Sequence, residues 1–185
     1  MLLNPHARFP LAAALQTVGA PLGEIYSFIS GLYFRGKMAY VDAFGAAPPG
    51  LPPAVVITPG AGLLPSDTQI TESQLLALAA IDIHADEPRY REPLERDARR
   101  LHEATGPDCQ FILLGSIATA KYIAPLLDCF GDRLVFPGDF VGRGDMSRGG
   151  LMLRCAREGR ELTYVPARGA VRHGPRPPRL PKLPR

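Results

Sequence analysis

The sequence predicts a single α/β domain with a three-layer, Rossmann-like arrangement, in which helices cover both faces of a mostly parallel central sheet. Short apolar runs typical of buried strands, at 54–58, 106–116 and 133–137, alternate with longer segments of helical periodicity. Glycine-bearing turns follow the first two runs, as they do where strands of open parallel sheets lead into helices. The chain has 185 residues and is 46% apolar, which suffices for one core and leaves little room for a second domain.

Three helices are expected in the first half of the chain. Pro10 precedes a short helix that Gly19 ends, and a longer helix covers about 32–44. A third helix begins at Thr71, because Thr71 and Gln74 have the spacing of a capping box. These helices are placed by their ends as much as by their apolar periodicity.

The helix at 32–44 also mixes aromatic and basic side chains. Tyr33 and Phe34 stand beside Arg35, and Lys37 follows one turn after Tyr33. Two interpretations remain open. Either the rings belong to the core and the cations are solvated, or a ring stacks on a base while Arg35 or Lys37 meets a phosphate.

The second half of the chain is expected to contain two helices and a C-terminal hairpin. Charged residues at i, i+4 spacing predict a surface helix over 93–105, and a second helix covers 118–130. The segment 151–167 alternates between apolar and polar residues. It is therefore expected to form a hairpin with Glu158 and Gly159 at its turn.

Two glycine turns are candidate binding positions. Gly62 follows the first strand and allows close approach of the backbone to a ligand. Gly115 and Ser116 stand where the second strand meets a helix, so free N–H groups and a hydroxyl can bind a phosphate or carboxylate. The alternative is that Ser116 or Thr119 only caps the helix.

The 139–150 loop carries the densest set of functional side chains. It contains the carboxylates of Asp139 and Asp145 together with the guanidinium groups of Arg143 and Arg148, and it is rich in glycine. A carboxylate beside two arginines stays ionised, and either arginine can hold a phosphate through two parallel hydrogen bonds. The alternative is an ordinary polar turn in which these charges brace one another.

Basic residues gather at the C-terminal end. Residues 166–185 contain six Lys or Arg and no acid, and removing them from the total of 21 leaves 15 basic against 18 acidic residues. A domain at 1–167 is therefore expected to precede an extended, proline-rich basic tail at 168–185. Such a tail attracts DNA or RNA, or serves only to keep the protein soluble.

Neither a metal, nor a cofactor, nor a membrane is expected as a partner. The three cysteines are far apart and are expected to be buried reduced thiols of a cytoplasmic protein, since the sequence has no secretory signal and no membrane-spanning segment. The sequence has no paired Cys or His motif of a zinc site. Four residues of an acidic segment could be metal ligands, but solvated loop side chains are the favoured interpretation: Asp82, His84, Asp86 and Glu87.

Two short motifs carry a family resemblance over about residues 20–130. They are Gly62, Leu63, Leu64, Pro65 and Asp67 in the middle of the chain, and Gly115 with Tyr122 later. This arrangement resembles a group of uncharacterised bacterial domains, and its middle motif resembles the uracil-DNA-glycosylase-like core domain of archaeosine tRNA-modifying enzymes. The resemblance implies a fold of that kind. Residues 1–20 contain no cysteine-bearing strand of the bacterial group, and no segment matches the water-activating motif of true uracil-DNA glycosylases.

The leading hypothesis is a domain that binds a nucleotide or nucleobase, with cleavage or exchange of an N-glycosidic bond as its catalytic form. That chemistry needs a carboxylate near the sugar, an anion contact and a stacking surface. The expected catalytic residues are Asp145 and Asp139. The expected ligand-binding residues are Gly115, Ser116, Tyr122, Arg143, Arg148, Gly62, Tyr33, Phe34 and Arg35.

Two further hypotheses belong to other classes. One is a non-enzymatic interaction protein that docks a partner through the 139–150 loop and the tail, whose PxxP-like pieces suit a polyproline ligand. The other is a hydrolase with Ser116 as nucleophile, although the G-x-S-x-G elbow is missing.

Overall fold

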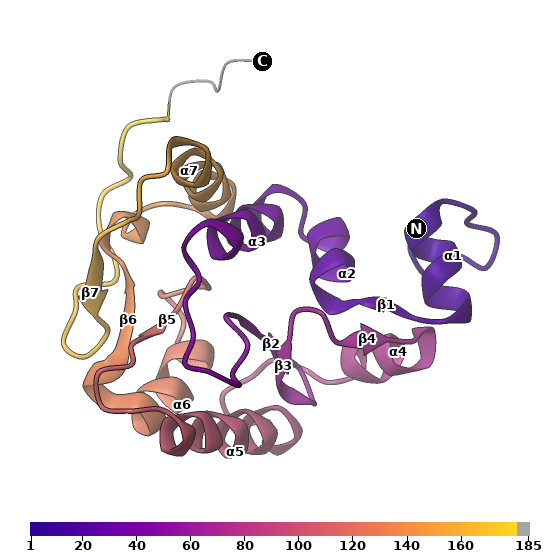
Figure 1. The fold of residues 1–185 in the computed structure, drawn as a ribbon, viewed down its shortest axis with the longest axis horizontal. Coiled ribbons are helices and arrows are strands. Elements are labelled where there is room, and N and C mark those ends of the chain that lie inside the picture. The colour runs from indigo at the N-terminus through magenta and orange to yellow at the C-terminus, as the bar shows by residue number, and fades with distance from the viewer. Residues whose placement is uncertain (181–185) are drawn as a thin grey trace.

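The computed structural model describes residues 1–180, and helices make up most of its regular structure (Figure 1). The α-helices are α1 (Pro10–Thr17), α2 (Leu22–Ile29), α3 (Leu32–Phe44), α4 (Glu72–Ala79), α5 (Pro88–Ala104), α6 (Ala120–Phe130) and α7 (Asp145–Glu158). The strands are β1 (Ala20–Pro21), β2 (Val55–Thr58), β3 (Gly62–Pro65), β4 (Gln69–Ile70), β5 (Phe111–Ile112), β6 (Leu134–Pro137) and β7 (Tyr164–Pro166). Two short 3₁₀ helices, η1 (Gly131–Arg133) and η2 (Gly138–Phe140), flank β6.

The strands form three small sheets. β1 pairs with β4 and β2 with β3, both antiparallel, while β6 lies between a parallel β5 and an antiparallel β7. The mixture of helices and strands agrees with the α/β class. Within residues 1–180, however, only the β5–β6 pair is parallel, so a mostly parallel central sheet is not seen there.

Helices lie on two sides of these strands. Figure 1 shows α5 and α6 together on one side and α3 with α7 on the other. The larger apolar core lies among these four helices and β6, with Tyr90, Phe136 and Met152 fully buried. A second core joins α1 and α2 to β1 and β4 around Leu15, Leu22 and Ile25.

Helix ends follow the sequence signals closely. The capping box is present as predicted, because Gln74 N donates to Thr71 Oγ1 over 3.4 Å and Thr71 N donates to Gln74 Oε1 over 2.8 Å. Gly131 follows α6 with a positive φ of 58°, which glycine adopts without strain. The capping signals therefore predicted α4 and the end of α6 correctly.

The predicted C-terminal hairpin at 151–167 is wrong. Its first part belongs to α7, whose buried positions Arg148, Leu151, Met152 and Cys155 have the spacing of one helix face. Gly159 has a left-handed conformation that ends this helix and does not form a hairpin turn. Alternation over a few residues also fits a helix, and here the buried face of α7 packs against α3.

A close contact between two glycines joins α3 to α7. A Cβ atom at Gly36 would lie 2.5 Å from the carbonyl oxygen of Gly149, and one at Gly149 would lie 2.6 Å from that of Leu32. Any larger side chain at either position would push the helices apart. Gly149 therefore serves helix packing, although the 139–150 segment was predicted to be a ligand loop.

The chain after β7 runs back over η2 and α7 without forming a helix or strand up to residue 180 (Figure 1). The carbonyl oxygen of Pro175 lies 2.1 Å from the position of a Cβ atom on Gly142, and Leu180 packs against the larger core. Arg168 Nε donates to Asp132 Oδ1 over 2.6 Å. The predicted PxxP piece at 181–184 lies outside the described residues. Among the helices of residues 1–180, none has the length and apolar character needed to cross a membrane.

Candidate functional site

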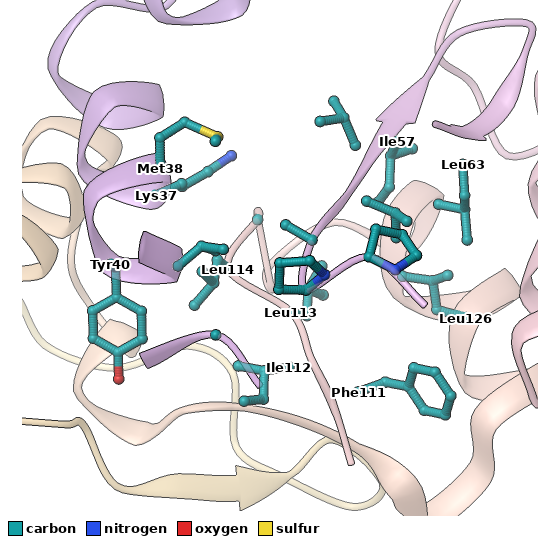
Figure 2. A pocket seen from close by; sticks show the side chains of 18 of the residues that line it. Lys37, Met38, Tyr40, Ile57, Leu63, Phe111, Ile112, Leu113, Leu114 and Leu126 are labelled. Atoms are coloured by element: carbon teal, nitrogen blue, oxygen red, sulfur yellow. The ribbon is translucent and has the colours of Figure 1, made fainter. Parts of the chain in front are cut away.

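A cavity of about 580 Å³ lies between α3, the connector that leads into β2, the β5 segment and α6. This volume is within the range of small-molecule sites. Most of its lining is apolar, as Figure 2 shows for Leu113, Leu114 and Leu126. In the same view the side chain of Lys37 points from α3 toward this apolar surface, and it is the only charged group among the labelled residues.

Four polar residues from three parts of the chain gather at one region of the lining, here called the polar end. They are Tyr33, Lys37, Tyr122 and Asp145. The charge of Asp145 affects the pKa values of Tyr33, Lys37 and Tyr122, so these groups lie within electrostatic reach of one another. Lys37 and Asp145 are the only charged residues of the described lining.

Lys37 is held over aromatic rings. Its Nζ atom lies 4.1 Å from the ring centroid of Tyr33 and 5.2 Å from that of Phe34. Within residues 1–180 the ammonium has no hydrogen bond and no ion pair. The pKa of Lys37 is lowered to about 8, mainly by burial; the charge of Asp145 opposes this shift and that of Arg148 adds to it. The cavity therefore contains a cation whose hydrogen-bonding capacity is unused.

The tyrosines of the polar end differ in their constraints. The Tyr33 hydroxyl donates to the carbonyl oxygen of Leu114 over 3.1 Å, which ties α3 to the segment after β5. Burial raises the pKa of Tyr33 to about 12, so its hydroxyl stays protonated at neutral pH. Burial and the nearby Asp145 charge also raise the pKa of Tyr122. Both phenols can act as hydrogen-bond donors and neither is a base at neutral pH.

The 139–150 segment divides between the cavity and the surface. Asp145 lines the cavity, is 63% exposed, and lies 3.7 Å from the buried guanidinium of Arg148. Arg148 donates from Nε and Nη2 to the carbonyl oxygen of Phe140, at 3.3 and 3.1 Å. Arg143 donates to the Asp139 carbonyl oxygen and to Ser147 Oγ, and neither Arg143 nor Asp139 lines the cavity. The two arginines brace this segment, so the bracing alternative describes their contacts.

Other predicted ligand residues also divide into two groups. Phe34 and Gly115 line the cavity, whereas Arg35 is exposed and Gly62 lies outside the lining. A Cβ atom at Gly62 would lie 2.1 Å from Asp97 Oδ2, so this glycine lets the β2–β3 turn lie on α5. The neighbours Pro59 and Leu63 of the Gly62 turn line the same cavity as Gly115, although Gly62 itself does not.

Ser116 is part of the lining and does not cap α6. The helix begins at Ala120, and Thr119 at its N-cap position makes no capping hydrogen bond. Thr119 Oγ1 instead lies 3.5 Å from Ser116 Oγ. The Gly115–Ser116 turn is thus separated from the helix start, and Ser116 contributes a hydroxyl to the cavity lining.

Metal binding has no support among the described residues, where no three His, Cys, Asp or Glu side chains are grouped to hold an ion. In the acidic segment, His84 Nδ1 lies 3.6 Å from Asp86 Oδ2, and both side chains are largely exposed. All three cysteines are free, and Cys155 alone is buried while Cys109 and Cys129 are partly buried.

Sequence reasoning gave Lys37 too little weight. Lys37 entered only as an alternative to Arg35 for a phosphate contact and not as a site residue in its own right. The signal was the helical spacing of Tyr33, Lys37 and Tyr40, which places a cation on an aromatic face. Whether that face is solvated or forms a cavity wall depends on segments that are distant in the sequence.

The chain matches neither any family model, nor any curated protein, nor any solved structure with which it was compared. The resemblance to uracil-DNA-glycosylase-like domains therefore stays a prediction from the short motifs. The functional argument depends on the cavity itself.

Proposed function

We propose that the protein binds a small molecule with an apolar body and one negatively charged group, such as a medium-chain carboxylate. The observation that carries this proposal is the single unpaired ammonium of Lys37 at the polar end of a mostly apolar cavity. An apolar body gains by leaving water, and a carboxylate gains a charge-assisted hydrogen bond that no protein group supplies to Lys37.

The polar end can hold such a head group with several donors. Tyr122 and Ser116 line the same cavity as Lys37 and bear hydroxyl groups. Asp145 is mostly exposed, so water screens its repulsion of a bound anion. A ligand with two phosphate groups, in contrast, would need more cations than the described lining provides. Arg143 and Arg148 donate to backbone carbonyl oxygens and are not part of that lining.

The test compares decanoate with decan-1-ol by isothermal titration calorimetry at pH 7. Wild type is expected to bind decanoate more tightly than the alcohol. In Lys37→Met the ratio of the two affinities should fall by about tenfold or more, because a hydrogen bond to a charged group is lost. Lys121→Met is the matched control, since Lys121 is outside the cavity lining. Equal affinities of wild type for both ligands, or no binding, would contradict the proposal.

A nucleobase or nucleoside is the second candidate ligand, favoured by the aromatic rings of Tyr33, Phe34 and Tyr122 in the same lining. This candidate goes together with the predicted three-layer, glycosylase-like fold. Asp145 would then be the carboxylate beside the sugar for N-glycosidic cleavage. A thermal-shift panel of nucleosides and nucleotides tests it. Stabilisation that Asp145→Asn alters supports this candidate, and silence across the panel removes it.

Nucleic-acid binding through the tail remains a separate proposal. Arg168 is held by Asp132, while Arg176 and Arg179 are exposed and available to phosphates. Affinity for DNA or RNA should fall steeply with salt, and deletion of residues 170–185 should flatten that dependence. If the deletion leaves the salt dependence unchanged, the tail is not the contact. The interaction-protein hypothesis concerns the surface formed by the tail and the 139–150 segment, part of which the tail covers.

A further inference from the structure

We propose that the Lys37 amine forms a reversible imine with an aldehyde or ketone that has an apolar body. The inference rests on the proposed function, since the same cavity would bind the carbonyl compound. It goes further, because Lys37 would act as a nucleophile toward this ligand class and not only as a cation.

Position is the first support. Lys37 Nζ lies over Tyr33 and Phe34 and has no hydrogen-bond or ion-pair partner in residues 1–180, so the nitrogen is accessible from the cavity. A bound chain that fills the apolar part would place a terminal carbonyl next to this nitrogen. Apolar burial of the chain then raises the local concentration of the carbonyl group.

Protonation is the second support. The charged groups that act on Lys37 are Asp145 and Arg148 on α7, its ammonium lies over Tyr33 on its own helix, and Tyr122 on α6 lines the same cavity. Together with burial, the cation of Arg148 favours the neutral amine, and Asp145 opposes it. With a pKa of about 8, an appreciable part of Lys37 is neutral at neutral pH, whereas an ordinary lysine is almost fully protonated.

The chemistry balances without an oxidant or reductant. The nitrogen lone pair attacks the carbonyl carbon, a C–N bond forms, and the carbonyl π electrons move to oxygen. A proton leaves nitrogen and one reaches oxygen, giving a carbinolamine, which then loses water to become the imine. Tyr122 and Ser116 line the same cavity, and their hydroxyl groups are the donors available to this oxygen.

The test uses decanal with sodium cyanoborohydride, which reduces the imine to a stable secondary amine. The chain has three lysines, Lys37, Lys121 and Lys182, so peptide mass mapping assigns the adduct directly. We expect the adduct at Lys37, formed about tenfold or more faster at pH 8 than with Nα-acetyl-lysine, because more of the amine is neutral. An adduct distributed equally over the lysines would overturn the proposal.

Two variants, together with decanoate binding, distinguish a failure of the imine proposal from a failure of the proposed function. Lys37→Arg keeps the positive charge and cannot form an imine, so it should bind decanoate and give no adduct. Lys121→Arg should behave as wild type. From pH 7 to 9, trapping should rise while decanoate binding weakens, because one needs the neutral amine and the other the ammonium. Decanoate binding without a Lys37 adduct overturns only the imine, whereas absence of both overturns the proposed function as well.

Discussion

The two sides of helix α3 are packed in opposite ways. Toward α7, Gly36 and Gly149 bring the backbones so close that no Cβ atom fits between them. Toward the β5 segment, the same helix faces a cavity of about 580 Å³ with Lys37 at its wall. The closed side should set stability and the open side should set ligand binding, because a residue influences stability most where its neighbours cannot move.

The largest expected effect is at the closed side. Gly36→Val adds a branched side chain where even a Cβ atom lies 2.5 Å from a backbone oxygen, so α3 and α7 must separate. We expect the free energy of unfolding to fall by about 3 kcal/mol, measured by urea denaturation. Gly106→Ala is the control, since an added Cβ atom there meets no atom within 4 Å. Equal losses in both variants would show that the glycine contact is not special.

The second prediction concerns Arg148, which is buried on α7. Arg148→Met removes the donors to the Phe140 carbonyl oxygen, and we expect a loss of about 2 kcal/mol in the free energy of unfolding. Arg143→Met, which removes more exposed bonds, should cost about 0.5 kcal/mol or less. A stability of Arg148→Met equal to wild type would mean that desolvation of the guanidinium cancels its bonds.

The third prediction concerns Tyr40, a cavity-lining residue of α3 whose hydroxyl is held by hydrogen bonds. Its hydroxyl accepts a hydrogen bond from Leu162 N over 2.9 Å and lies 2.7 Å from the Tyr164 hydroxyl. Tyr40→Phe should therefore lower the free energy of unfolding by about 1 kcal/mol in chemical denaturation. Tyr122→Phe is the matched control, because the Tyr122 hydroxyl has no hydrogen bond within residues 1–180. A larger loss in the control would contradict the assignment.

The prediction for Lys37 concerns how the free energy of unfolding changes with pH, and not a loss of stability at one pH. Its pKa is lowered from 10.5 to about 8 in the folded state, so the unfolded chain binds more protons between these values. Wild type should therefore gain stability relative to Lys37→Met as pH rises from 8 to 10.5, and the difference should be constant below 8. Thermal denaturation of both proteins across this range measures it. A difference that does not change with pH would mean that Lys37 is not desolvated.

Local signals were sufficient for several helix ends. Thr71 and Gln74 satisfy each other's backbone groups within one turn, and Gly131 adopts the positive φ that stops α6. Such features depend on residues three or four positions apart, so the sequence specifies them. The helix α3 was also predicted with its observed ends, Leu32 and Phe44.

Distant contacts explain the errors. The 151–167 segment alternates well enough for strands, yet its first part belongs to α7, which packs on α3 through Gly149. In the 139–150 segment the charges suggested a site, but Arg143 and Arg148 bond backbone carbonyls of the same segment and leave only Asp145 in the cavity. Polar density alone does not show whether side chains satisfy one another or remain available to a ligand.

The sequence by itself determined the α/β class in its coarse form, the capped ends of the helices and the aromatic-basic face of α3. Only the tertiary structure decided that this face would form a cavity wall with Lys37 unpaired, and that Gly149 would meet Gly36. The physical reason is the sequence separation between the residues that determine each feature. Caps and periodicity are settled within a few residues, whereas burial of a charge depends on segments such as 113–116 and 145–148 that chain folding brings together.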